Sequence, residues 1–143
     1  MGAERGARVV AAARGWIGTP YHHQASVKGA GADCLGLVRG VYREVTGREP
    51  ERAPAYSRDW GETDGVETLL AAAGRHLVTV PLGGIAPGDV IVFRLRSKTV
   101  AKHAAILATP DTMIHAMEGT AAAEVALSKW WRRRLAGAFR FPD

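Results

Sequence analysis

Three short apolar stretches in the second half of the chain constrain its fold more than any other feature. The stretches cover residues 90–95, 103–108 and 112–117. Their β-branched and other apolar residues are typical of strands, and only a turn at Pro110 and Asp111 separates the last two. A connection that short joins strands that lie side by side, so this part of the chain predicts paired strands of a sheet.

Helical periodicity marks the N-terminal part of the chain. In residues 3–14, Val9, Val10 and Ala13 form the apolar side of an alanine-rich helix that ends at Gly15. The same kind of reasoning predicts helices at 34–46, 66–73 and directly after Ser128, and strands at 76–80, 125–127 and 138–141. In this interpretation His76 is a strand residue that faces solvent. With 143 residues, we expect a single domain spanning residues 1–143.

Charge and cysteine content limit the function classes. The formal net charge of +5 favours polyanionic partners, but the basic residues are spread along the chain apart from Arg132, Arg133 and Arg134, which argues against a specific nucleic-acid groove. A single cysteine excludes an internal disulfide framework and cysteine-rich zinc sites. We see no apolar run long enough to insert into a membrane and no secretory signal, so we expect synthesis in the cytoplasm without an export signal.

The only cysteine, Cys34, lies where a glycine-rich loop meets a predicted helix. Asp33 is a good N-cap residue, and apolar residues follow at helical spacing until Gly47. A thiol in the first turn of a helix faces unpaired N–H groups and the positive end of the helix dipole, which predicts a lowered pKa and a nucleophilic role. The alternative is a small buried core residue, since free cysteine is among the most buried residue types.

Two histidines can supply the base that such a nucleophile needs. His103 opens one predicted strand, and His115 lies twelve positions later on the next. Residues of paired strands can meet on one face, so His103 could act as the base while His115 orients it. Taken singly, each histidine is better explained as a half-buried strand residue. Together with Cys34 they predict a Cys-His-His triad.

Two other groups of side chains invite a functional interpretation. His22 and His23 lack companions at metal-ligand spacing, so we expect a polar loop and no metal site. Trp130 and Trp131, followed by the three arginines, could stack on sugars, bind an anionic polymer or dock a partner. The favoured alternative is one tryptophan in the core and a solvated arginine face.

These motifs resemble those of the NlpC-type cell-wall peptidases, and specifically the branch carried by phage tails and phage-derived gene transfer agents. The resemblance covers almost the whole chain. It rests on five motifs: Gly18-Thr19-Pro20-Tyr21, Asp33-Cys34-Leu35-Gly36-Leu37-Val38, Pro87-Gly88-Asp89-Val90, His103 opening its apolar strand, and Ile114-His115-Ala116.

The resemblance implies a fold and a set of site residues. The fold would be α+β and papain-like, with N-terminal helices packed on a central antiparallel sheet. Cys34 would be the nucleophile, His103 the base and His115 its orienting partner. Tyr21 would lie beside the oxyanion site, and Asp33 would cap the helix and contact substrate. The chain departs from the family at Leu35, where most members have serine, which leaves the catalytic set intact.

The resemblance also implies an activity: a peptidoglycan endopeptidase that cleaves stem-peptide amide bonds, typically between D-γ-glutamyl and the diamino acid, without metal or organic cofactor. In this branch the enzyme would travel in a phage-like particle, bound to tail-tip or hub proteins, and act in the recipient periplasm during DNA delivery. The alternative is a structural tail-tip or plug protein that keeps the fold with little or no activity.

Overall fold

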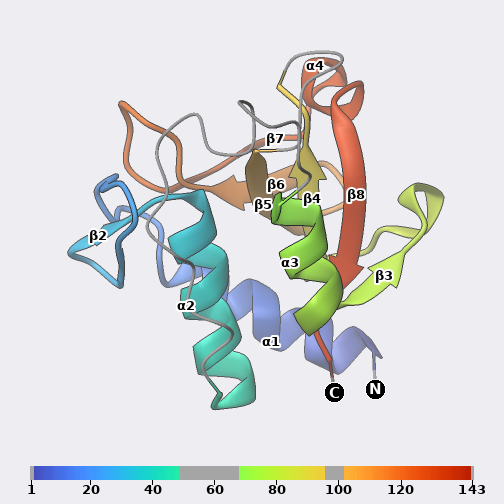
Figure 1. Ribbon diagram of the computed structural model, residues 1–143, viewed down its shortest axis with the longest axis horizontal. Helices are drawn as coiled ribbons and strands as arrows, with labels where there is room; N and C mark the ends of the chain where they lie inside the picture. Colours follow the sequence, from blue (N-terminus) through green and yellow to red (C-terminus); the bar gives the residue numbers. More distant parts are fainter. Residues whose placement is uncertain (1, 49–67, 96–101, 143) are drawn as a thin grey trace.

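Six strands form the central antiparallel sheet of the computed structural model, which describes residues 2–48, 68–95 and 102–142. The spatial order is β3-β8-β4-β5-β6-β7 (Figure 1). The strands are β3 (Val78–Val80), β4 (Val90–Phe93), β5 (His103–Thr109), β6 (Thr112–His115), β7 (Ala123–Ala126) and β8 (Leu135–Arg140). The paired strands expected from the apolar stretches and the turn at Pro110 are therefore confirmed.

Side chains alternate between two core clusters along the central strands. On β5, Ala104 and Ile106 join the cluster formed with the helices, whereas Ala105 and Leu107 join a second cluster on the other face. This alternation is the period of two that a strand buried on both faces requires. The central strands β4 and β5 are consequently almost wholly buried.

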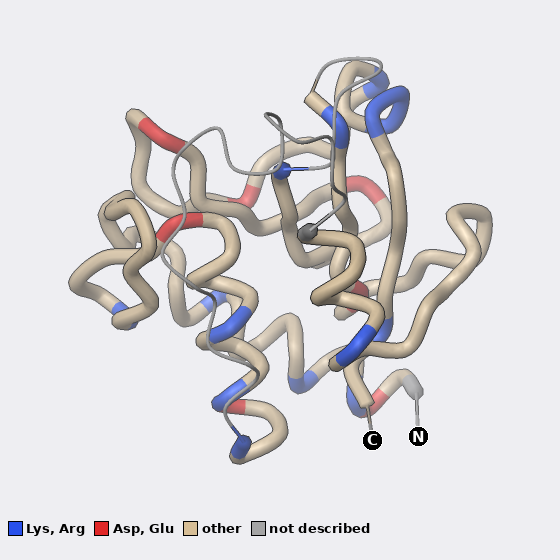
Figure 2. Tube along the Cα trace, viewed as in Figure 1, with Lys and Arg blue, Asp and Glu red and all other residues tan. Residues whose placement is uncertain are grey.

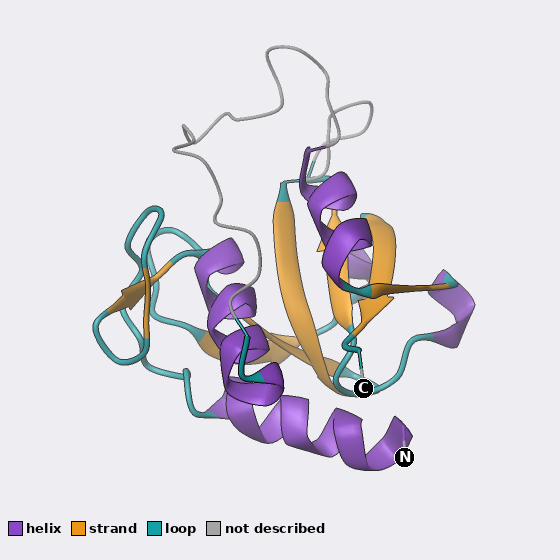
Figure 3. Ribbon diagram, turned by 60° about the horizontal axis from the view of Figure 1, so that its bottom comes forward, coloured by secondary structure: helices purple, strands orange, loops and turns teal. Residues whose placement is uncertain are grey.

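The three longer helices pack on the face of the first cluster. They are α1 (Gly2–Arg14), α2 (Cys34–Thr46) and α3 (Thr68–His76). Val9 and Val10 of α1, Leu37 and Val41 of α2, and Leu69 of α3 are buried there. Figure 3 shows α1 and α2 crossing beside the sheet. The predicted α+β fold, with N-terminal helices on an antiparallel sheet, is confirmed.

Helix α2 begins and ends at the residues that the sequence indicates. Asp33 is the N-cap, and its side chain accepts a hydrogen bond from the backbone N–H of Gly36. Gly47 ends the helix at φ 72°, a left-handed conformation that glycine adopts without steric cost. The Asp33 cap makes Cys34 the first residue of the helix, and Gly47 sets its end.

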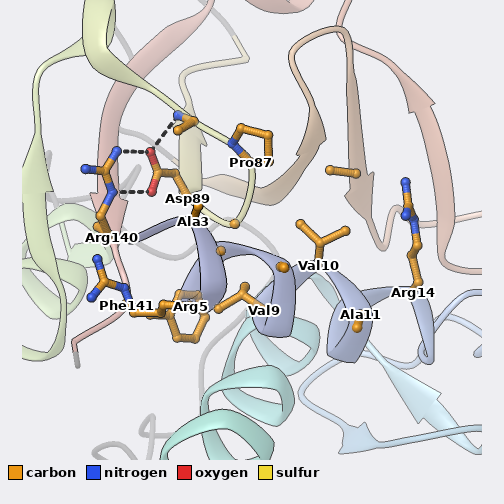
Figure 4. Close-up of a pocket in the computed structure, with 15 residues that line it drawn as sticks. Ala3, Arg5, Val9, Val10, Ala11, Arg14, Pro87, Asp89, Arg140 and Phe141 are labelled. Carbon is orange, nitrogen blue, oxygen red and sulfur yellow. Dashed lines mark hydrogen bonds and ion pairs between the residues drawn. The ribbon is translucent and has the colours of Figure 1, made fainter. Parts of the chain in front are cut away.

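An ion pair joins the turn before β4 to the end of the sheet. The Arg140 guanidinium donates to both oxygens of the buried Asp89 at 2.8 and 2.9 Å, and the Ala86 N–H donates to the same carboxylate at 2.8 Å (Figure 4). The α1 backbone passes close to this turn, since a Cβ on Gly6 would lie 2.4 Å from the Pro87 carbonyl oxygen. The Pro87-Gly88-Asp89 motif therefore connects α1, β4 and β8.

Several local predictions need correction. His76 is the last residue of α3 rather than a solvent-facing strand residue, and its ring meets Tyr42 edge-on at 6.2 Å. The strand that follows starts at Val78. The sequence analysis also missed a two-stranded ribbon, β1 (Ser26–Val27) with β2 (Gly31–Ala32), and the 3-10 turn η1 (Leu82–Gly84).

The short helix after Ser128 is confirmed as α4 (Lys129–Arg132), with the Ser128 hydroxyl accepting from the Trp131 N–H. Figure 2 shows basic residues around α4 and also along the other helices. None of the helices in the described ranges has the length and hydropathy that a membrane span requires.

Candidate active site

Cys34 is placed by a tightly packed junction between loop and helix. The Asp33 carboxylate is buried; one oxygen accepts from the Gly36 N–H at 2.7 Å and the other from the Gln24 N–H at 2.8 Å. The Ala25 carbonyl oxygen lies so close to Gly36 that a Cβ there would approach it to 1.8 Å. Asp33 thus holds the preceding loop against the first turn of α2 and fixes the position of Cys34.

The thiol of Cys34 points to the start of β5. Its sulfur lies 3.8 Å from the carbonyl oxygen of Lys102, to which the S–H donates. The backbone N–H groups of Ala104, Leu35 and Cys34 itself also interact with the sulfur. The thiol therefore contacts the main chain on both sides of His103.

The acidity of Cys34 differs from the expectation. Burial and, to a smaller extent, the negative charge of Asp33 raise the pKa of the thiol, the backbone N–H groups lower it, and together these effects bring it to about 12. The helix N-terminus does favour the thiolate as predicted, but desolvation outweighs it. The prediction of a lowered pKa is wrong for this structure, and the resting residue is a thiol.

His103 and His115 form a direct imidazole pair. His103 Nε2 lies 2.9 Å from His115 Nδ1, and both side chains are buried. The β5–β6 register pairs Ile106 with Ile114 and Leu107 with Met113. Continued by one residue, it sets His115 opposite Ala105, so His103 is its diagonal neighbour on the same face.

The imidazole pair is neutral at rest. Burial and, to a smaller extent, the neighbouring His115 together lower the pKa of His103 to about 3. Burial also lowers the pKa of His115. One neutral ring donates the shared hydrogen and the other accepts it, which fixes complementary tautomers. Because Nε2 of His103 is engaged by His115, the nitrogen left for the thiol is Nδ1.

The structure gathers the three predicted catalytic residues at the beginning of β5. Among the described residues, the hydrogen bonds of the Cys34 sulfur run to the main chain and not to an imidazole nitrogen. Proton transfer from Cys34 to His103 therefore requires the thiol to turn from the Lys102 carbonyl toward Nδ1. The catalytic roles of the three residues stay predictions.

Tyr21 and the two adjacent histidines lie on the loop beside the nucleophile. Tyr21 forms an isolated parallel bridge with Ala32, two residues before Cys34, and packs partly buried against the core. His23 Nδ1 lies 3.9 Å from Asp33 Oδ2, whereas the His22 ring covers Gly31. Across the described ranges, no three histidine, cysteine or acidic residues gather as a group that could hold a metal.

Sequence reasoning missed one member of the site. Trp131 of α4 stacks on the His103 ring, with centroids 5.4 Å apart and an interplanar angle of 28°, and meets His115 edge-on at 5.5 Å. Trp130, by contrast, is 47% exposed and lies beneath the Arg134 guanidinium at 3.7 Å. Trp131 is partly buried against the second core cluster, in agreement with the favoured alternative of one tryptophan in the core. No spacing in the sequence links Trp131 to the histidines.

Comparison with known proteins supplies the family. The NlpC/P60 family matches residues 18–140. The chain is 30% identical over 136 residues to the gamma-DL-glutamyl hydrolase of Bacillus subtilis (strain 168), a match that covers 94% of this chain and 29% of that protein. The chain thus spans under a third of the length of this curated relative.

Solved structures show the same fold. The NlpC/p60 domain of the peptidoglycan hydrolase SagA superposes with a TM-score of 0.70 at 23% identity, covering 95% of this chain and 98% of that one. NlpC2 from Trichomonas vaginalis gives a TM-score of 0.69 at 18% identity, covering 96% and 46%. Together with the family match, these likenesses establish that the chain belongs to the NlpC/P60 family of cysteine-peptidase-type hydrolases.

Proposed function

We propose that this domain is a peptidoglycan endopeptidase that cleaves the stem-peptide amide bond between D-γ-glutamyl and the diamino acid. The observation that carries the proposal is the His103–His115 pair at 2.9 Å, held beside the Cys34 thiol at the start of α2. A half-buried thiol near an oriented imidazole is suited to acyl transfer. The names of the relatives, a gamma-DL-glutamyl hydrolase and a peptidoglycan hydrolase, favour this substrate class.

The reaction would proceed through a thioester. The Cys34 S–H transfers its proton to Nδ1 of His103 while the sulfur attacks the γ-carbonyl carbon, and the carbonyl electron pair becomes an oxyanion. The N-terminus of α2 stabilises negative charge at this point. Collapse of the intermediate expels the amine, which takes the proton from His103. Water, deprotonated by His103, then hydrolyses the thioester and restores the thiol.

The resting protonation states fit this sequence of steps. A thiol and a neutral imidazole avoid burying an ion pair before substrate arrives. His115, hydrogen bonded to Nε2, fixes the ring orientation and shares the positive charge that develops on His103. Asp33 uses both oxygens on backbone N–H groups, which favours a structural contribution over direct substrate contact.

We further propose that the domain acts in the tail tip of a phage-like particle, opening the recipient wall during DNA delivery. The motif resemblance to the tail-borne branch of the family is the support for this context. The alternative is a tail-tip or plug protein that retains the fold with little or no activity. Particles carrying Cys34→Ala separate the two: an enzymatic role predicts assembled particles that deliver DNA poorly, whereas a plug predicts normal delivery.

The test of the activity is digestion of purified Gram-negative peptidoglycan by the wild-type protein, with Cys34→Ala as the matched control. Mass spectrometry of the soluble fragments identifies the bond from the new amine and carboxylate ends. We expect γ-glutamyl-terminated fragments from the wild type only. Equal release by both proteins, or none by a folded wild type, would argue against the proposal.

A further inference from the structure

We propose that Trp131 is a positioning residue that locks the orientation of the His103–His115 pair. The inference rests on the proposed function, because it assigns to Trp131 the task of holding the base ready. The effect of Trp131 would pass through the two imidazoles.

The geometry around Trp131 supports this task. Its indole lies nearly parallel to His103 at 28° and nearly perpendicular to His115 at 87°, so one side chain contacts both rings from different directions. Phe93, the register partner of His103 on β4, meets the indole at 4.9 Å and His103 at 6.1 Å. The imidazole of His103 is therefore bounded by Phe93, Trp131 and His115.

The helix that carries Trp131 is anchored at several points. Arg132 donates to the Leu127 and Pro110 carbonyl oxygens at 3.0 and 2.9 Å. Arg134 donates to the Leu95 and Trp130 carbonyl oxygens at 3.3 and 2.8 Å. The contacts to Leu127, Pro110 and Leu95 tie the α4 segment to the chain after β7, to the β5–β6 turn and to the chain after β4, so the indole is held by the scaffold and not only by its own packing.

Aromatic rings around the histidine pair matter because a neutral imidazole–imidazole hydrogen bond is weak in water. Exclusion of water strengthens the bond and prevents a competing donor from reversing the tautomers. A flat apolar ring against His103 also removes rotamers in which Nδ1 would turn away from the thiol. Both effects would hold the orientation of His103 in which Nε2 meets His115 and Nδ1 is left as the acceptor that the proposed reaction needs.

The test is a graded series at one position: Trp131→Phe, which keeps a ring too small to touch both imidazoles, and Trp131→Leu, which removes the ring. Trp130→Leu is the control, because it removes the neighbouring indole from the same helix. ¹⁵N NMR of the imidazoles reports the tautomers, and iodoacetamide reports the reactivity of Cys34. Neither readout requires substrate.

We expect Trp131→Leu to mix the tautomers of the pair and to slow both alkylation and kcat by about tenfold or more, with KM nearly unchanged, since general base catalysis contributes at least that much. Trp131→Phe should fall between it and the wild type, and Trp130→Leu should match the wild type. If Trp131→Leu does not fold, the Phe variant decides the question. Tautomers and alkylation rates that stay unchanged in the folded variants would overturn the proposal.

His103→Gln distinguishes failure of this inference from failure of the proposed function. If the alkylation rate of Cys34 is lower in His103→Gln than in the wild type, but is unchanged in the Trp131 variants, only the role of Trp131 is refuted. If the alkylation rate of Cys34 is the same in His103→Gln and the wild type, His103 is not the base. The NMR measurement of the tautomers would still test whether Trp131 orders the imidazole pair.

Discussion

His103 Nε2 and His115 Nδ1 lie 2.9 Å apart, buried on adjacent strands and diagonal to one another in the β5–β6 register. The shared hydrogen bond occupies Nε2 of His103, so only Nδ1 can interact with the nucleophile. A strand pair, and not a loop, therefore sets the direction of the base.

The buried histidine pair makes the free energy of unfolding depend on pH. The folded-state pKa of His103, about 3, is below its ordinary value of 6.5, so the stabilisation is fully present above pH 6.5 and is lost as pH falls toward 3. We expect a loss on the order of a few kcal/mol over this range. Urea unfolding of the wild type and of His103→Gln between pH 7 and 4 measures this loss. If the free energy of unfolding falls equally with pH in both proteins, the lowered pKa of His103 is not its cause.

Cys34 should remain a thiol through neutral pH. Its pKa of about 12 predicts that thiolate absorbance near 240 nm rises only in strong alkali, after subtraction of the Cys34→Ala spectrum. Because the folded pKa is raised, the stability present below the ordinary pKa of 9.0 is lost as pH rises toward 12. A thiolate signal at pH 7 would show that the helix N-terminus outweighs burial after all.

Asp33 couples the helix cap to the thiol. Its charge raises the pKa of Cys34, so Asp33→Asn is expected to lower that pKa in the same absorbance titration. The variant should also destabilise the protein by roughly 1–3 kcal/mol, since an amide cannot accept from both the Gly36 and Gln24 N–H groups. An unchanged or higher thiol pKa in a folded Asp33→Asn protein would refute the electrostatic coupling.

Gly36 is required by packing and not by helix propensity. A Cβ there would lie 1.8 Å from the Ala25 carbonyl oxygen, a backbone atom, so Gly36→Ala should cost roughly 3 kcal/mol. Gly74→Ala is the matched control, because that glycine is also helical and a Cβ there has no atom within 4 Å. Helix propensity predicts a gain of about 0.5–1 kcal/mol for the control. Chemical denaturation measures the free energy of unfolding of both variants. If the two substitutions change it by similar amounts, the close contact at Gly36 is ruled out.

The sequence predicted the strands and α2 well because their signals are local. The apolar β-branched stretches, the turn at Pro110, the Asp33 cap and the Gly47 stop each act within a few residues. The proximity of His103 and His115 followed from hairpin geometry. Their diagonal offset depends on the strand register, which only the structure reveals.

What the sequence did not predict depends on contacts between distant segments. The pKa of Cys34 is dominated by burial, which the helix pattern cannot reveal. Trp131 reaches the histidines only because α4 folds over the sheet beside Phe93. His76 has strand-like neighbours in sequence, yet it completes α3 against Tyr42.

The catalytic role of Cys34 is tested most directly by trapping the acyl-enzyme. The wild-type protein, mixed with a defined stem peptide and quenched in acid, should carry the D-γ-glutamyl fragment as a thioester. Intact-mass spectrometry followed by peptide mapping should locate that fragment on Cys34 and find none on Cys34→Ala. Peptide cleavage that continues in Cys34→Ala, with no adduct on the wild type, would contradict the account.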